Sequence, residues 1–383
     1  MRRNGDLPIR GARIAQLIET DGPGGAERIL AHLATELAAA GCPGVAFLPA
    51  EQEGWLSRQL AAAGIPVEYF RLERPLSPKL ARALADGLRR HRIDLAHSHE
   101  FTMGFYGAWA ARKAGVPHVL TMHGGRYYAA RVRRRLALRA AVARSGGVVA
   151  VSHVLARQLA RDLWIPPARI ATIPNGIRFA AVAHSTLRAE LALAPDDHLI
   201  VAVGNLYLVK GHRYLLEAVA QLSARRPNLH VAIAGRGDLA AALAQQAQQL
   251  GLPRRLHLLG LRSDVANVLA AADIFVLPSL SEGLPLALLE AMTAGRPIVA
   301  SAVGEVPVAL VAGAAGLLVP PGDPAALASA LDRLLTNPSE ARRLAESARA
   351  RAAAEYGSTR MVARYAALYE PLLAKRGAAR AQS

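Results

Sequence analysis

Short apolar runs alternate with amphipathic helical segments along almost the whole chain. The run ARIAQLI (12–18) leads into the glycine loop DGPGG (21–25) and then into a helical segment over 26–41. Buried strands separated by helices of this length are typical of a parallel sheet covered by helices on both faces. The alternation therefore predicts an α/β fold of doubly wound, Rossmann-like sheets.

The alternation occurs as two series, and residues 179–197 between them lack a strand pattern. Since 383 residues suit two domains of roughly 150 to 200 residues each, we expect two such domains that face each other across a cleft. We expect an N-terminal domain over 1–180, a C-terminal domain over 181–357, and a final segment over 358–383. In that segment, a helix over 358–373 can pack back on the first domain, and the tail is expected to fray. Predicted strands lie at 12–18, 43–49, 66–72, 94–99, 118–124, 147–152, 168–177, 198–204, 229–235, 255–260, 273–278, 297–301 and 316–320.

Composition bears on the cellular compartment of the protein. The single cysteine, Cys42, cannot form an internal disulfide, and the opening MRRNGDLPIR contains no apolar segment typical of a secretory signal. Since no run of about 20 apolar residues occurs either, we expect a cytoplasmic protein without a membrane span.

Charge is unevenly shared along the chain. Residues 1–180 carry 26 Lys and Arg against 13 Asp and Glu, a balance of +13, whereas residues 181–383 carry 20 against 16, a balance of +4. A basic first half indicates an anionic partner, and nucleic acid, an anionic membrane surface and a phosphorylated substrate all fit it.

The stretch SLSEGLPLALLEAM (279–292) places two carboxylates, Glu282 and Glu290, in an apolar run. Pro285 favours a helix start, so Glu282 is expected in the loop before the helix and Glu290 inside it. The apolar residues between them predict a helix buried on nearly every face. Glu290 could form an internal ion pair with an arginine, or it could accept hydrogen bonds from two hydroxyls of a ligand sugar. Glu282 could simply be a favourable charge at a helix N-terminus.

Lys210 ends the stretch VGNLYLVKGH (203–212), which follows a predicted strand. Only four residues of the chain are lysine, and this one precedes a helix entry. Its compact charge suits a phosphate at the carboxyl end of a strand, although a solvated surface lysine is an equally good interpretation. The glycine loop GPGGAER (22–28), with Gly24 and Gly25, also resembles a turn that cradles phosphate, although a plain strand-to-helix turn is the more common meaning of such a pattern.

Histidines lie at two predicted strand ends, in HSHE (97–100) and TMHGG (121–125). His97 and His99 could ligate a metal ion, but no set of carboxylates or cysteines with metal-ligand spacing accompanies them, so we predict no metal site. His123, beside two glycines, is the better candidate for substrate contact, although a single histidine is more often structural.

A strongly basic helical segment is predicted near 128–144. Its surface is expected to rest on anionic lipid or to hold a phosphorylated acceptor, or else to be a solvated basic face. The residues that define it are Arg131, Arg133, Arg134 and Arg135.

Taken in order, these pieces resemble the family-four retaining glycosyltransferases, which have the GT-B fold of two facing Rossmann-like domains. The resemblance covers essentially the whole chain, and Glu282 and Glu290 match the E-x7-E signature of that family. The segments that carry it are GPGGAE, HSHE, TMHGG, VVAVS, IPNGI, VGNLYLVKGH, IAGRGD, GLRSDV and ADIFVLPSLSEGLPLALLEAMTAGRPIVAS.

The resemblance implies a role for each candidate residue. In the second domain, Glu290 would accept hydrogen bonds from ribose hydroxyls and Lys210 would neutralise the diphosphate of a UDP- or GDP-sugar donor. Glu282, with the backbone amides of Gly283 and Leu284, would face the transferred sugar. In the first domain, Gly24 and Gly25 would close over the diphosphate and His123 would lie at the reacting sugar. The resemblance further implies a metal-independent reaction without a cofactor, and a cell-envelope glycan, lipopolysaccharide or lipid-linked acceptor.

Two positions depart from the family pattern. Asn205 stands where the family usually has arginine, for which Arg213 or Arg236 could substitute, and residues 304–308 replace the usual Gly-Gly-x-Pro-Glu turn. Two other functions remain open: a basic nucleic-acid-binding protein, and a sugar-nucleotide enzyme such as an epimerase on the same fold. Because only 5% of residues are aromatic and no recognition motif occurs, we expect no nucleic-acid partner.

Overall fold

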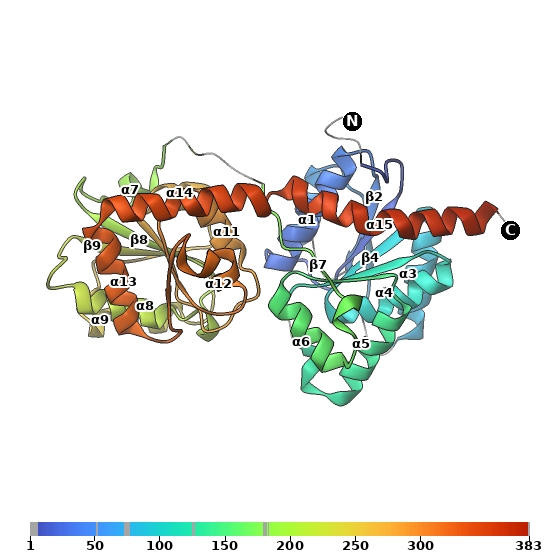
Figure 1. Cartoon of the computed structure of the whole chain (residues 1–383), viewed down its shortest axis with the longest axis horizontal. Helices are drawn as coiled ribbons and strands as arrows, with labels where there is room; N and C mark the ends of the chain where they lie inside the picture. Colours follow the sequence, from blue (N-terminus) through green and yellow to red (C-terminus); the bar gives the residue numbers. More distant parts are fainter. Residues whose placement is uncertain are drawn as a thin grey trace. The chain divides into compact units, whose positions relative to one another are not determined.

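The computed structural model describes residues 7–50, 53–72, 77–124, 127–178, 182 and 184–381. The chain divides into two compact units, one comprising Met1–Ile177 with Ser358–Ser383 and the other Arg178–Gly357. Each unit is an α/β fold built on a parallel sheet, as predicted (Figure 1).

The first unit contains a seven-stranded parallel sheet in the order β3-β2-β1-β4-β5-β6-β7. The order reverses at β1, because β2 and β3 lie on one side of it and β4 to β7 on the other. Ligands of doubly wound sheets bind at the carboxyl ends of the strands beside such a reversal. The strands are β1 (Ile14–Leu17), β2 (Gly44–Pro49), β3 (Val67–Phe70), β4 (Leu95–His99), β5 (His118–Met122), β6 (Gly147–Ala150) and β7 (Ala171–Thr172).

Helices and buried side chains cover this sheet. Leu17, Phe47 and Tyr106 are each at most 1% exposed and form one core with α3 and α4. The helices are α1 (Gly25–Ala39), α2 (Trp55–Ala62), α3 (Pro78–Arg90), α4 (Glu100–Ala114), α5 (Val132–Arg144), α6 (His153–Leu163) and α15 (Ser358–Ala381), with short 3-10 turns η1 (Tyr127–Ala130) and η2 (Pro167–Arg169). The basic helix therefore begins at Val132 and not near 128, because a separate 3-10 turn precedes it.

The last helix, α15, belongs to the first unit and contacts α1 (Figure 1). The helix is longer than the predicted 358–373, since α15 continues to Ala381. Arg376 explains part of the difference: its side chain is only 10% exposed and donates to the backbone oxygen of Ile93 and to Asp94. Pro371 is accommodated inside this helix.

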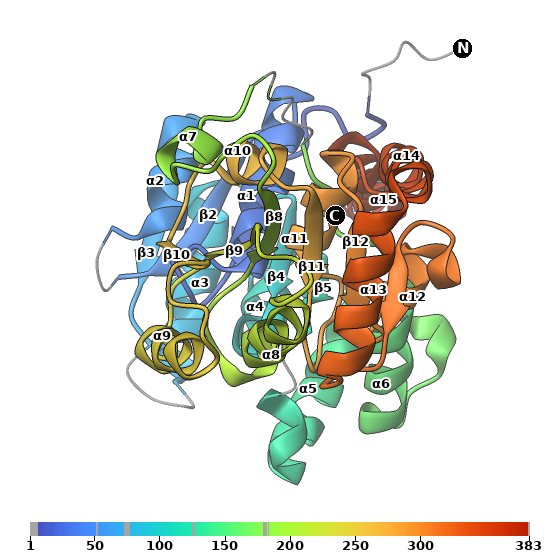
Figure 2. The ribbon, with the colours of Figure 1, turned by 90° about the vertical axis from the view of Figure 1, so that its left-hand side faces the viewer.

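The second unit contains a six-stranded parallel sheet in the order β10-β9-β8-β11-β12-β13, which reverses between β8 and β11. Helices α8 and α13 pack against each other over its core (Figure 2). The strands are β8 (His198–Val203), β9 (Leu229–Ala234), β10 (Leu256–Gly260), β11 (Ile274–Leu277), β12 (Ile298–Ser301) and β13 (Leu317–Val319). The helices are α7 (Leu187–Glu190), α8 (His212–Leu222), α9 (Ala240–Gln249), α10 (Val265–Ala270), α11 (Leu286–Thr293), α12 (Val306–Ala309), α13 (Pro324–Thr336) and α14 (Pro338–Glu355), with 3-10 turns η3 (Leu208–Lys210) and η4 (Val311–Gly313).

The segment expected to be a mere connection, 179–197, is partly folded onto the second unit. Ser185 donates its hydroxyl to the backbone oxygen of Asn267 at 2.7 Å, Leu187 is fully buried, and Arg188 pairs with Asp273 at 2.5 Å. A pattern of strands alone could not reveal this short helix. Among the described residues, no helix is long and apolar enough to cross a membrane.

Candidate functional site

Lys210 and Glu282 meet at the carboxyl ends of the two central strands of the second unit. Lys210 ends the 3-10 turn that follows β8, and Glu282 lies in the loop between β11 and α11, as predicted. The Lys210 Nζ atom lies 2.7 Å from Glu282 Oε1, and the Ser279 hydroxyl donates to the same oxygen at 2.7 Å. The side chain of Glu282 is 8% exposed and that of Lys210 26%. A buried carboxylate is thereby satisfied by a cation and a hydroxyl at the reversal point of the sheet.

Two glycines allow the loops around this pair to approach closely. A Cβ atom on Gly304 would lie 2.0 Å from the backbone oxygen of Glu282, and one on Gly211 would lie 2.1 Å from that of Pro278. Both residues also have a positive φ, of 55° and 66°, which favours glycine. The altered turn at 304–308 thus lies against the Glu282 loop, and the backbone amide of Glu305 donates to the Gly283 oxygen at 3.0 Å.

Glu290 lies on α11 behind this loop. Leu288, Leu289, Ala291 and Met292 are buried, whereas Leu286 and Ala287 are only half-buried. The prediction of a helix buried on nearly every face was therefore wrong, because one side of α11 is partly accessible. Glu290 is half-buried as well.

The remaining donor-site candidates of the second unit lie in the same loops. Gly283 is half-buried, and the side chain of Leu284 is 4% exposed. Asn205 is exposed two residues after the end of β8. The two possible substitutes for the missing arginine, Arg213 and Arg236, are also exposed, and Arg213 stacks over Tyr214 at 4.7 Å from the ring centroid.

In the first unit, His123 follows β5 and contacts His99 at the end of β4. The Nε2 atom of His123 lies 2.8 Å from Nδ1 of His99, whose own Nε2 lies 2.9 Å from Gln16 Oε1 on β1. The Glu100 carboxylate accepts from the His123 backbone amide at 3.0 Å. Three adjacent strands therefore place this chain of side chains at the reversal point of the first sheet.

The hydrogen bonds assign the proton of His123. With Gln16 Oε1 facing His99, the His99 Nε2 proton is donated to Gln16, and neutral His99 must accept at Nδ1 from His123 Nε2–H. Neutral His123 then presents an unprotonated Nδ1, a buried atom with no hydrogen-bond partner among the described residues. This assignment follows from the orientation of the Gln16 amide.

Burial keeps these histidines neutral. Desolvation lowers the pKa of His123 from 6.5 to about 4, and it lowers the pKa of His97 and His99 well below the usual value, with help from neighbouring histidines. A neutral His123 can accept a hydrogen bond from a hydroxyl at neutral pH. Among the described residues, no group of three or more His, Cys, Asp and Glu is placed to hold a metal ion.

Several partners in this network were not identified from the sequence. On α15, the Tyr369 hydroxyl lies 2.7 Å from His97 Nδ1, and the Tyr365 hydroxyl lies 3.1 Å from Thr121 Oγ1, which contacts His97 Nε2 at 2.7 Å. Of these partners, the sequence indicates only Gln16, which is the one polar residue of the apolar strand β1. Nothing in the sequence indicates the tyrosines, because α15 lies more than 200 residues away.

The other predicted residues of the first unit lie at two further places. Gly24 is the N-cap of α1 and Gly25 its first residue. Arg131, the N-cap of α5, and Arg133 are exposed, while Arg134 and Arg135 are half-buried. The arginines do not stand alone there: exposed apolar side chains lie among them, namely Val132 at 56%, Leu136 at 53% and Trp164 at 54%, and Arg135 lies 5.5 Å from the Trp164 ring centroid.

Known proteins with the same organisation match both halves of the chain. A family model described as "Glycosyltransferase Family 4" matches residues 23–180, and one described as "Glycosyl transferases group 1" matches residues 184–351. A D-inositol 3-phosphate glycosyltransferase of Frankia alni is 32% identical over 78% of this chain and 88% of its own. The UDP-Gal:alpha-D-GlcNAc-diphosphoundecaprenol alpha-1,3-galactosyltransferase of Escherichia coli is 34% identical over 56% of this chain, which spans only 59% of that enzyme.

The fold matches solved structures too. The crystal structure of Anabaena HepE in complex with UDP superposes with a TM-score of 0.83 over 94% of this chain and 100% of its own, at 24% identity. Together, the two parallel sheets, the two family models and the Frankia relative lead to one conclusion: this chain belongs to the family-four glycosyltransferases and has their GT-B fold.

Proposed function

We propose that this protein is a retaining glycosyltransferase that moves a hexose-type sugar from a UDP- or GDP-sugar to a lipid-linked or cell-envelope glycan acceptor. The single observation that carries the proposal is the Lys210–Glu282 pair at the reversal point of the second sheet. The HepE structure with UDP supports a nucleotide donor for this fold, and the E. coli relative supports a lipid-linked acceptor.

Lys210 is suited to a diphosphate. Its ammonium group has three N–H donors, and Glu282 takes one of them, so two remain for phosphate oxygens. Helix α8 begins two residues later at His212, and its N-terminal amides favour an anion at the same place. As the sugar leaves the diphosphate, negative charge grows on the leaving phosphate, where these fixed donors stabilise it.

The two glutamates take separate roles in this proposal. Glu282 orients Lys210 and, with the amides of Gly283 and Leu284, faces the transferred sugar. Glu290 accepts hydrogen bonds from the ribose hydroxyls of the nucleotide. Neither role requires a carboxyl group to exchange a proton.

His123 is the proposed sugar-facing residue of the first unit. Its unprotonated Nδ1 can accept from a sugar hydroxyl, and the His99 contact fixes the orientation of the ring. Gly24 and Gly25 offer amides at the start of α1, which are suited to an anionic group of the donor.

We also propose reversible membrane contact through the surface formed by α5 and Trp164, the residue that follows α6. Arginines with exposed Val132, Leu136 and Trp164 combine attraction to anionic lipid with apolar side chains that can enter the interface. Such contact suits a lipid-linked acceptor. Cosedimentation with phosphatidylglycerol vesicles should fall for Leu136→Ser and Trp164→Ser, and equal retention of these variants and the parent would contradict this surface.

Transfer activity tests the donor site. Lys210→Ala and Glu290→Ala should fold and lose most transfer activity, whereas Lys79→Ala, which removes an exposed lysine from α3, should retain it. Thermal shifts with UDP, GDP and ADP identify the base, because ligand at 100 times its Kd adds about 2.7 kcal/mol of stability. Nuclear magnetic resonance of the product reports whether the anomeric configuration of the donor is kept. Full activity of folded Lys210→Ala would refute the site.

A further inference from the structure

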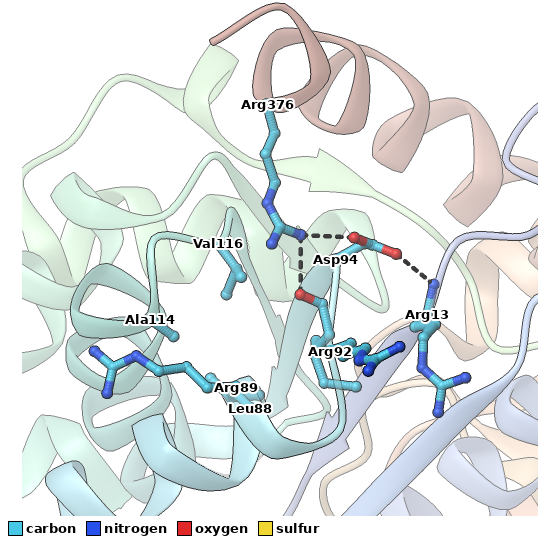
Figure 3. A pocket seen from close by; sticks show the side chains of 9 residues that line it. Arg13, Leu88, Arg89, Arg92, Asp94, Ala114, Val116 and Arg376 are labelled. Atoms are coloured by element: carbon cyan, nitrogen blue, oxygen red, sulfur yellow. Dashed lines mark hydrogen bonds and ion pairs between the residues drawn. The ribbon is translucent and has the colours of Figure 1, made fainter. Parts of the chain in front are cut away.

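A cavity of about 440 Å³ opens at the opposite end of the first sheet, where the strands begin. Its lining comes from the start of β1, the turn between α3 and β4, the ends of α3 and α4, and α15 (Figure 3). Asp94 precedes β4, whereas His99 ends it, so five residues at about 3.3 Å each place the two some 16 Å apart. The cavity is therefore separate from the histidine chain described above. The residues that line it are Arg13, Leu88, Arg89, Arg92, Ile93, Asp94, Ala114, Val116 and Arg376.

The lining of this cavity is strongly basic. It contains four arginines and one carboxylate, Asp94, a formal balance of +3. Both Asp94 oxygens are already engaged, since Oδ2 accepts from the Arg13 backbone amide at 3.0 Å and Oδ1 accepts from Arg376 Nη1 at 2.9 Å. Figure 3 shows Arg376 reaching from α15 to Asp94 and Arg13 beside that carboxylate, while Arg89 lies on the far side next to Ala114. Arg89 is paired as well, with Asp86 outside the lining at 2.8 Å, so Arg13 and Arg92 are the lining arginines without a carboxylate partner among the described residues.

Stabilisation of the local backbone accounts for only some of these arginines. Arg13 Nε donates to the His91 oxygen at 2.8 Å, Arg89 donates to the Lys113 oxygen, and Arg376 donates to the Ile93 oxygen at 2.9 Å. Such bonds suit cations near helix C-termini. They leave both terminal nitrogens of Arg13 without an acceptor among the described residues.

Arg92 is the one arginine of the cavity whose side chain makes no hydrogen bond to a backbone oxygen of the described residues. Its side chain is exposed and has no partner among the described residues. It stands directly after the C-cap of α3 with a φ of 51°, a left-handed conformation in which glycine is ordinarily favoured. A charged residue is therefore held at the cavity in a conformation that glycine would adopt more easily.

The corresponding end of the sheet in the second unit has a different charge balance. A cavity of about 510 Å³ there is lined by two arginines and three aspartates, together with His198. Arg188 and Asp273 pair within it at 2.5 Å. Its charges compensate one another, so an excess of arginine is not a general consequence of this kind of sheet edge.

We propose that the cavity beside Arg92 and Arg376 binds a phosphate ester. Guanidinium groups match phosphate oxygens with paired hydrogen bonds, and several of them can share one phosphate. The volume exceeds that of a single oxyanion, and Leu88, Ile93 and Val116 supply an apolar wall for an organic substituent. A small soluble phosphate ester and the headgroup of an anionic phospholipid share this chemistry.

Arg92→Gly is the decisive variant. Glycine fits the left-handed backbone and the lost side chain is exposed, so the variant should fold at least as well as the parent. Arg254→Gly is its matched control, because Arg254 is an exposed turn residue of the second unit outside this cavity and its loss removes the same charge.

Calorimetric titration of the full chain with glycerol 3-phosphate tests the soluble source, and cosedimentation with phosphatidylcholine vesicles with and without phosphatidylglycerol tests the lipid source. In one or both arms, Arg92→Gly should weaken binding about tenfold, equivalent to about 1.4 kcal/mol, while Arg254→Gly should not. The arm that responds identifies the source. No saturable binding in either arm, or equal weakening by both variants, overturns the proposal.

The Lys210→Ala variant separates this site from the donor site. It should lose transfer activity yet keep the binding that depends on Arg92, whereas Arg92→Gly should keep basal transfer activity. Phosphate ester binding that disappears with Lys210 and persists without Arg92 would assign the binding to the donor site and overturn the cavity.

Discussion

His118 should make the first unit sensitive to acid. Its ring is 2% exposed and lies between two hydroxyls, with Nδ1 2.7 Å from Ser145 Oγ and Nε2 2.9 Å from Ser98 Oγ. Ser145 donates its only proton to the Ala141 oxygen at 2.8 Å, so it must accept from His118 Nδ1–H. Nε2 therefore accepts from Ser98, and the neutral ring satisfies both contacts.

The free energy follows from the pKa. Burial lowers the pKa of His118 to about 3, against about 6.5 in the unfolded chain. Between these values the unfolded state binds one proton more than the folded state, so stability is complete above about pH 6.5 and falls as the pH drops toward about 3. At about 1.4 kcal/mol per unit, lowering the pH to about 5 costs close to 2 kcal/mol for this residue alone.

Denaturant titrations at about pH 7 and pH 5 measure this cost. All three tryptophans, Trp55, Trp109 and Trp164, belong to the first unit, so their fluorescence reports its unfolding selectively. The variant His118→Leu should be less stable than the parent at neutral pH, because it leaves Ser98 and Ser145 without their partner. Between about pH 7 and pH 5, its free energy of unfolding should nevertheless fall by about 2 kcal/mol less than that of the parent, because the other buried histidines titrate in both proteins. Equal losses in the two proteins would refute the reasoning.

Three further substitutions test the structure. Gly304→Ala should destabilise the second unit by about 1 to 3 kcal/mol more than Gly251→Ala, as measured by denaturation followed by circular dichroism. Both positions have positive φ, but only at Gly304 would the new Cβ atom lie 2.0 Å from a backbone oxygen. Tyr369→Phe should cost about 1 to 3 kcal/mol in tryptophan-detected unfolding, since it leaves a buried nitrogen of His97 unpaired; no loss would mean that this bond is replaced. Arg92→Gly should raise the stability of the first unit by about 1 kcal/mol, and a decrease would show that the arginine stabilises its turn.

Strand and helix positions were largely predictable because each strand is an apolar run buried on both faces of a sheet. The runs at 12–18 and 198–204 each contain the observed strand, β1 and β8. The errors fell where tertiary contacts override local pattern. Helix α15 extends beyond the predicted 358–373, and Arg376 in that extension contacts Asp94, which lies 282 residues away.

The candidate site shows the same division. Lys210 and Glu282 were each identified from residue type and position, but their ion pair was not, because 72 residues separate them. The pairing depends on β8 and β11 being neighbours in the sheet. Likewise, His99 and His123 were noted separately at strand ends, and their contact depends on β4 lying beside β5.

Periodicity and residue type, which are local properties, determined the α/β class, the positions of most strands and the chemical candidates in SLSEGLPLALLEAM. Which side chains contact one another is decided by packing between segments far apart in the sequence. Only that packing pairs Glu282 with Lys210, brings Tyr369 to His97, and places four arginines around one cavity. A carboxylate in an apolar stretch demands a partner because an unpaired buried charge is costly, but only the folded chain selects which partner it receives.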